Sequence, residues 1–153
     1  MGPTPRRRPL ARFTKAAIAL ELLLSIGALA GGAALIFGPR GEVIPLPLSA
    51  LAGSPFGTYL VPGLILFCVL GLVPLAAARL AWVGHPLAPI GALVVGAALI
   101  IWVAVEVAIV GYSNEPPLQA IYLLLGAAIT VIALRWLADV GLPALHGRTA
   151  TRI

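Results

Sequence analysis

The sequence predicts an all-α, polytopic membrane protein, in which four transmembrane helices form one bundle with both termini in the cytoplasm. Apolar residues make up 61% of the chain and charged residues 10%, whereas soluble domains have about 45–50% and about 25%. The mean hydropathy is +1.08. Because so few charges cannot cover the surface of a soluble monomer, the soluble and disordered classes are excluded.

Four apolar runs are long enough to cross a bilayer, since about 20 helical residues at about 1.5 Å each span a hydrocarbon core of about 30 Å. The predicted spans are residues 16–37, 59–78, 88–110 and 118–136. Helices are required because ten-residue alternating strands are absent and lipid leaves no backbone group unpaired. The bundle, 16–138, follows a basic segment, 1–15, and precedes a polar tail, 139–153.

The basic residues predict the orientation of the bundle. Nine of the ten Lys and Arg residues lie on one side of the predicted spans, and Arg40 alone lies on the other. The positive-inside rule then places both termini in the cytoplasm, in the inner membrane of the cell. The first apolar run is too long for the apolar core of a signal peptide. The basic N-terminal segment predicts contact with anionic lipid headgroups rather than with nucleic acid.

The outer connection, residues 38–58, contains a stretch that is unusually apolar for a loop. Residues 44–51 hold five apolar aliphatic side chains and two prolines. Such a stretch is expected to lie at the bilayer interface, either as a plain connector or as a lid over the mouth of the bundle. Within the second span, Pro62 and Pro74 are expected to bend the helix or to lie near its ends.

Small residues predict where the helices touch, because inside lipid helices associate where small side chains let the backbones approach. The first span contains Gly27-x-x-x-Gly31, and Gly-Ala-Ala triplets occur at 32–34, 96–98 and 126–128. Residues 26–36 and 90–100 are also identical at nine of eleven positions. This similarity indicates either a duplicated hairpin or the chance outcome of a composition rich in Ala, Gly and Leu.

Two glutamates lie inside predicted spans, where a charge costs a few kcal/mol and therefore needs a partner. Glu21 lies at the depth of Arg135 and Arg79, so a structural ion pair among these residues is expected. Glu106 lies near the outer end of the third span, one turn after Trp102.

The outer ends of the neighbouring spans offer polar partners for Glu106. Gln119 and Tyr122 begin the fourth span and Tyr59 begins the second, which predicts an outer polar cluster of Glu106, Gln119, Tyr122 and Tyr59, with Trp102 beside it. Two interpretations stay open: a binding site for a small ligand, or a set of hydrogen bonds that only holds the helix ends together.

Signs of catalysis or of cofactor binding are missing from the sequence. Cys68 is the single cysteine, so neither an intrachain disulfide nor a cysteine-based metal site is possible. His85 and His146 lie in different segments and are expected to be solvated side chains rather than metal ligands. No nucleophile has a nearby base and no glycine-rich phosphate loop occurs. We therefore expect no enzyme activity, no metal and no cofactor.

Three segments carry a resemblance to known proteins: GSPFGTYLVPGLILF at 53–67, IWVAVEVAIVG at 101–111, and PLQAIY at 117–122, followed by Gly126. Over residues 17–135 the chain resembles a widespread group of small, uncharacterised bacterial membrane proteins with four spans. The resemblance implies this fold and a bacterial source, but no activity. Similar proteins often have glutamine at the position of Glu106, which implies a polar residue there rather than a proton carrier.

Two hypotheses of function follow. The first is a non-catalytic scaffold or accessory component, which associates with itself or with another membrane protein. The second is a small transporter or ligand-binding protein that uses the outer polar cluster around Glu106. The first is favoured because four short helices with two interior carboxylates leave little room for a translocation path.

Overall fold

The computed structural model describes residues 12–112 and 117–140, and every regular element in these two ranges is helical. The elements are α1 (Arg12–Phe37), the 3₁₀ helix η1 (Leu48–Leu51), α2 (Leu60–Ile65), the π-helix η2 (Leu66–Leu72), α3 (Val73–Trp82), α4 (Ala88–Val110) and α5 (Leu118–Val140). Segments α2, η2 and α3 form one continuous helix, Leu60–Trp82. It and the other three long helices are each long and apolar enough to cross a membrane, as predicted for a multi-pass membrane protein.

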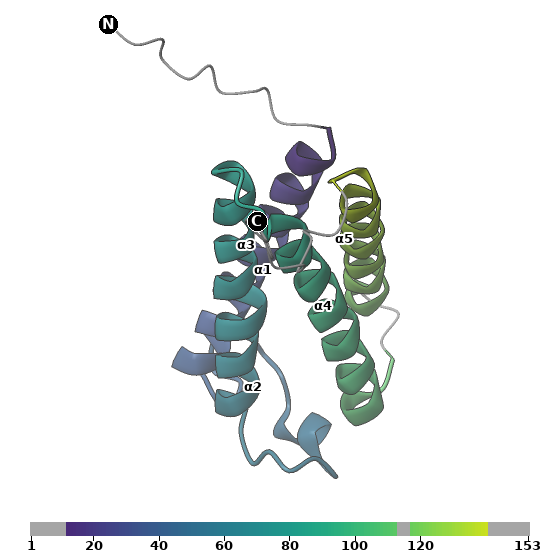
Figure 1. The fold of residues 1–153 in the computed structure, drawn as a ribbon. Coiled ribbons are helices and arrows are strands. Elements are labelled where there is room, and N and C mark those ends of the chain that lie inside the picture. Colours follow the sequence, from purple (N-terminus) through teal and green to yellow (C-terminus); the bar gives the residue numbers. More distant parts are fainter. Residues whose placement is uncertain (1–11, 113–116, 141–153) are drawn as a thin grey trace, which may run out of the picture.

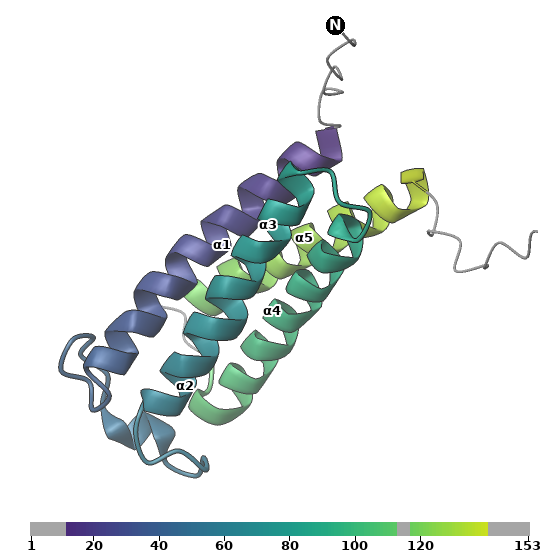
Figure 2. The same ribbon diagram turned by 60° about the vertical axis from the view of Figure 1, so that its left-hand side comes forward.

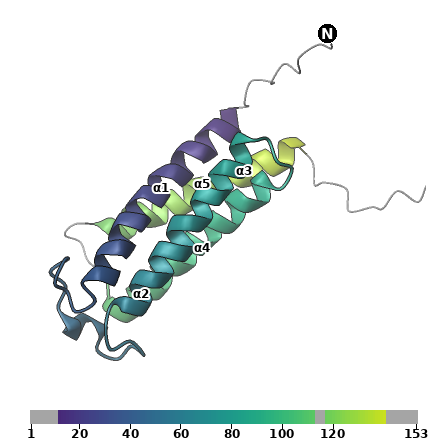
Figure 3. The ribbon, with the colours of Figure 1, turned by 90° about the vertical axis from the view of Figure 1, so that its left-hand side faces the viewer.

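The four long helices form a bundle of two antiparallel hairpins (Figures 1 and 2). One hairpin pairs α1 with α2–η2–α3, and the other pairs α4 with α5. Contacts of α3 with α4 and of α1 with α5 join the hairpins, whereas α2 touches neither α4 nor α5. In Figure 3 the start of α1, the α3–α4 turn and the end of α5 lie at one end of the bundle, and the 38–59 connection lies at the other. We call these the basic end and the loop end.

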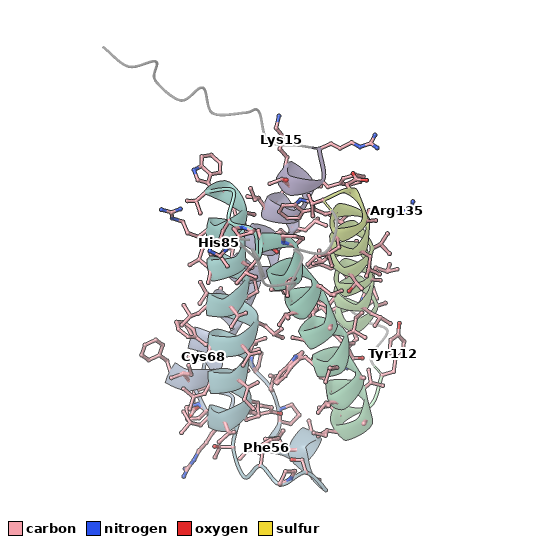
Figure 4. All side chains as sticks on the ribbon, viewed as in Figure 1. Lys15, Phe56, Cys68, His85, Tyr112 and Arg135 are labelled. Atoms are coloured by element: carbon pink, nitrogen blue, oxygen red, sulfur yellow. The ribbon has the colours of Figure 1, made fainter. Side chains whose placement is uncertain are left out.

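Three of the helices extend further at the basic end than the apolar runs predict. The helix α1 begins at Arg12, α3 ends at Trp82 and α5 ends at Val140, whereas α4 covers the predicted range. Helical hydrogen bonding continues past the apolar run because long cationic side chains reach out from the helix ends to polar surroundings. Figure 4 shows Lys15 and Arg135 pointing away from the bundle at this end, with His85 on the nearby turn.

A π-helical stretch interrupts the second span where Pro74 follows. Proline has no N–H group, and its ring clashes with the carbonyl four residues earlier, so the preceding turn widens. In this turn the Val73 N–H donates to the Cys68 carbonyl, five residues back. The Ser25 hydroxyl of α1 donates a buried hydrogen bond of 2.7 Å to the Gly71 carbonyl. Pro74 therefore changes the hydrogen-bond pattern, and α1 holds the altered turn in place, whereas Pro62 lies in the first turn of α2.

The glycine of each Gly-Ala-Ala triplet lies at a helix contact, as the small-residue pattern predicts. A Cβ atom on Gly32 would lie 2.7 Å from the backbone nitrogen of Phe67, so α1 and η2 touch backbone to backbone. A Cβ atom on Gly96 would lie 3.0 Å from the Gly126 carbonyl oxygen, and the converse distance is 3.3 Å. In the Gly27-x-x-x-Gly31 motif, by contrast, no backbone lies this close: a Cβ atom would meet the Leu66 side chain at 3.5 Å from Gly31 and the Tyr122 hydroxyl at 3.2 Å from Gly27.

Two hydrophobic clusters fill the bundle. The larger lies in its middle and contains Leu24, Leu70, Leu99 and Ile129 among its buried members. The smaller lies at the basic end, and its buried members are Ala17, Ile18, Ala78, Ala81, Ala88 and Trp136. Each cluster takes side chains from both hairpins, so the hairpins form one body.

The apolar stretch 44–51 folds back onto the loop end of the bundle. Leu51 of η1 is buried in a third cluster with Leu35 and Tyr59, and the Tyr59 hydroxyl donates a 2.8 Å hydrogen bond to the Pro47 carbonyl. Leu46 and Leu48 stay exposed. Ile44 packs against the same cluster, and η1 also contacts α4. The predicted tails and the middle of the 111–117 turn, residues 1–11, 113–116 and 141–153, lie outside the described residues.

Candidate functional site

Glu106 and Gln119 form the polar pair that links α4 to α5 at the loop end. The Gln119 side-chain amide donates to the Glu106 carboxylate at 3.3 Å and to the Gly111 carbonyl at 3.0 Å. Gly111 ends α4 with a φ of +83°, a conformation that favours glycine. Gln119 is buried and Glu106 half-buried. The predicted proximity of these two side chains is therefore confirmed.

Trp102 and Tyr122 lie near this pair but face the core. Both are half-buried and pack against the central hydrophobic cluster. The Tyr122 hydroxyl lies against α1, since a Cβ atom on Gly27 would be 3.2 Å from it. No hydrogen bond joins Tyr122 to Glu106 within the described ranges. These aromatic side chains therefore belong to the packing of the core and add no hydrogen bond to the pair.

Tyr59 does not belong to the outer cluster, and the prediction that placed it there is wrong. Its ring is buried against Leu35 and Leu51, and its hydroxyl bonds to Pro47. The error has a physical reason: Tyr59 starts the second span, and α2 packs on α1 without touching α4 or α5. Equal depth along the membrane normal does not bring two residues together where the helix segments beside them are not in contact.

The expected ion pair of Glu21 does not form. Both carboxylate oxygens of Glu21 are buried without a hydrogen-bond partner among the described residues. Arg79 and Arg135 are exposed, and within residues 12–112 and 117–140 neither makes an ion pair. Long cationic side chains near a helix end gain more from reaching polar surroundings than from entering an apolar core. The prediction matched the depth of these residues but not the direction of their side chains.

A groove lies between α1 and α3 on the outside of the bundle at the basic end. It measures about 500 Å³ and is lined by Ile18, Leu22, Leu75, Ala78, Arg79, Trp82 and Val83. Ile18 and Ala78 belong at the same time to the buried cluster of the basic end. The sequence did not predict this groove. Ala78, whose small side chain leaves space for it, cannot be distinguished by sequence from the other alanines of the same apolar run.

The described residues offer no metal site: they contain no group of three or more His, Cys, Asp or Glu side chains that could hold an ion. Cys68 is exposed on the outside of η2, and His85 accepts a hydrogen bond from the backbone N–H of Leu87. His146 lies outside the described residues. The chemistry available inside the bundle therefore comes from the Glu106–Gln119 pair and from the isolated carboxyl group of Glu21.

No protein-family model, curated protein or solved structure matches this chain. The resemblance to small four-span bacterial membrane proteins stays a prediction.

Proposed function

We propose that this protein is a non-catalytic membrane component that acts by association, as a scaffold or accessory subunit for a second copy or for another membrane protein. The observation that supports this proposal is the outward face of α4. Ala97, Ile101, Ala104 and Ala108 follow one another along this face at helical spacing, and all four are exposed. Small residues on a lipid-facing stripe allow a further helix to approach closely.

The distribution of small residues strengthens this interpretation. Gly32, Gly96 and Gly126 make close helix contacts inside the bundle, whereas Ala97, Ala104 and Ala108 of α4 are exposed. Ile101, which is 63% exposed, stands between Ala97 and Ala104 and supplies the large side chain that a small-residue stripe on a partner would receive. The alternation of small and large residues is the arrangement of a helix–helix contact.

Disulfide cross-linking in native membranes tests self-association. In a Cys68→Ser background, Ala104→Cys is expected to give a disulfide-linked dimer. Val105→Cys is the matched control, because it is the next residue of the same helix, 47% exposed, and points about 100° away. Equal cross-linking from both positions would mean random collision in the membrane rather than a defined interface.

Association with a different membrane protein requires a second experiment. A photo-reactive phenylalanine analogue is placed at position 104 or at position 105 in cells of the source organism. The proposal expects an adduct from position 104 alone, either with the mass of a dimer or with that of one other membrane protein. If neither experiment gives a product specific to position 104, the α4 face is only a lipid contact and the proposal is wrong.

The Glu106–Gln119 hydrogen bond favours a second candidate function, a small ligand-binding or transport protein. Gln119 donates a hydrogen bond to the Glu106 carboxylate at the loop end, and Trp102 and Tyr122 lie one helical turn away along α4 and α5. A positioned carboxylate next to aromatic rings suits a small organic cation. Tetramethylammonium is a suitable probe: it should raise the melting temperature of the purified protein, and Glu106→Gln should abolish the shift. An equal shift in both proteins would reflect a general salt effect.

The proposed orientation places the basic end of the bundle in the cytoplasm, as the positive-inside rule predicts. In a Cys68→Ser background, Ser49→Cys should react with a membrane-impermeant maleimide in intact cells. His85→Cys, at the opposite end, should react only after the membrane is opened. The reverse pattern would invert the topology and would also remove the predicted contact between the N-terminal segment and anionic lipids of the inner leaflet.

A further inference from the structure

Glu21 is the most isolated polar side chain in the described bundle. Its exposed fraction is 0%, and neither carboxylate oxygen has a hydrogen-bond partner. Ala17 and Ile18, one turn earlier on α1, belong to the cluster at the basic end, and Leu24, one turn later, belongs to the central cluster. The carboxyl group therefore lies between two apolar layers, in the half of α1 nearer the basic end.

No charge in the described residues compensates a carboxylate at this position. The cationic groups on α1 and its neighbours at this end of the bundle are Arg79 of α3, Arg135 of α5, and Arg12 and Lys15 of α1 itself, and all four are exposed. On α5, Asp139 follows Arg135 at the helix end. The helix α4 carries a single titratable group, Glu106, at the opposite end of the bundle, and Cys68 of η2 is exposed.

An isolated carboxylate in an apolar interior is strongly unfavourable, and such a group takes up a proton instead. A neutral carboxylic acid still lacks hydrogen bonds here, but it avoids the much larger cost of an unpaired charge. A side chain of the same shape with methyl groups in place of both oxygens would give a more stable fold than the acid does. The structure thus contains a polar group whose surroundings stabilise it only in the protonated form.

The α1–α3 groove gives this group a short route to the surface. Ile18 and Leu22, the residues three before and one after Glu21, line the groove from α1, and Ala78 lines it from α3. Ile18 and Ala78 are buried core residues at the same time. One layer of side chains therefore separates the open groove from the interior in which Glu21 lies, and Arg79 stands on the open side of that layer.

We propose that Glu21 is a proton-binding site inside the bundle, which exchanges its proton through the seam between α1 and α3. The site takes a proton as its ligand, and the Arg79 side chain in the groove offers a counter-charge to the carboxylate that forms when the proton leaves. The Ser25–Gly71 hydrogen bond, one turn along α1 from Glu21, keeps α1 and η2 together while the seam opens. The proposal is independent of the association through α4.

The lipid-soluble reagent dicyclohexylcarbodiimide tests this proposal, because it reacts with protonated carboxyl groups in apolar surroundings. The carboxyl proton moves to one nitrogen of the carbodiimide, and the carboxylate oxygen bonds to the central carbon, so that an O-acylurea adduct forms without a leaving group. The full-length protein in lipid vesicles is incubated with the reagent over a range of pH values. Intact-mass and peptide mass spectrometry then measure the extent and the position of the adduct.

The expected result is one adduct on Glu21, whose yield falls as the pH rises and the carboxyl group loses its proton. A water-soluble carbodiimide should leave Glu21 unmodified, since the group has no exposed surface. Glu21→Gln should abolish the adduct, whereas Glu106→Gln, the matched change at the other glutamate of the spans, should leave it unchanged. Because the peptide map locates the adduct in the wild-type protein, the result does not depend on how well Glu21→Gln folds.

A further pair of variants tests whether Glu21 is reached through the α1–α3 groove. Leu22→Ala widens the groove and should speed the labelling several-fold. Leu23→Ala removes the same side chain at the next position, which is 62% exposed and lies outside the groove, and should leave the rate unchanged. The proposal is overturned if the folded protein gives no adduct on Glu21 while detergent-unfolded protein does, if the yield is independent of pH, or if both leucine variants behave alike.

Discussion

The neighbouring glycines of α1 give a sharp test of the bundle packing. Gly31→Ala and Gly32→Ala make the same chemical change at consecutive positions of one helix. At Gly31 the new methyl group would meet the Leu66 Cδ2 atom at 3.5 Å, an ordinary contact. At Gly32 it would lie 2.7 Å from the Phe67 backbone nitrogen and 2.8 Å from the Phe67 Cα atom. A backbone cannot yield as a flexible side chain does, so α1 has to move away from η2.

The expected difference in unfolding free energy between the two variants follows from two opposing effects. Alanine in place of glycine inside a helix stabilises by roughly 0.5–1 kcal/mol, and this gain applies equally at both positions. Overpacking of a close contact costs about 1–3 kcal/mol, and this cost applies at Gly32 alone. The gains cancel in the comparison, so the free energy of unfolding of the Gly32→Ala protein should be lower by about 1–3 kcal/mol than that of the Gly31→Ala protein.

Unfolding by sodium dodecyl sulfate in mixed micelles, followed by far-ultraviolet circular dichroism, measures both variants against the wild type. Gly31→Ala should unfold at the same or a higher detergent fraction than the wild type, and Gly32→Ala at a lower one. Equal midpoints for the two variants would show that α1 and η2 are not in backbone contact. The pairing of α1 with the second span would then have to be rejected.

Substitutions at three further positions probe individual hydrogen bonds. Ser25→Ala leaves the Gly71 carbonyl without its side-chain donor and should cost about 0.5–1.5 kcal/mol of unfolding free energy in the same titration. Tyr59→Phe releases the anchor of the outer connector and should speed proteolysis within residues 38–58, with little effect on the midpoint of helix unfolding. Glu106→Gln keeps an acceptor for Gln119 and should unfold like the wild type, whereas Glu106→Leu should be less stable by about 1 kcal/mol; equal stability of these two variants would argue against the hydrogen bond.

The sequence alone was sufficient for the fold class and for the positions of the helices. Twenty apolar residues in lipid have one way to satisfy their backbone groups, so the run lengths predict the spans without knowledge of their neighbours. The same holds for the glycines of the Gly-Ala-Ala triplets, because close helix approach in a membrane depends on small residues. Gln119 was correctly paired with Glu106, since α4 and α5 are joined by a short turn and must be adjacent.

The tertiary structure decided which faces of the helices meet. The sequence alone does not predict these contacts. Glu21 and Arg79 lie at one depth, yet Glu21 faces the core and Arg79 faces the groove. Tyr59 and Glu106 lie at one end of the bundle, yet the α2 segment that follows Tyr59 does not touch α4. Apolar residues surround each helix on all sides, because lipid and protein interior are equally apolar. Hydropathy therefore marks the depth of a residue but not its direction, and only the packing of the four helices left Glu21 without a partner.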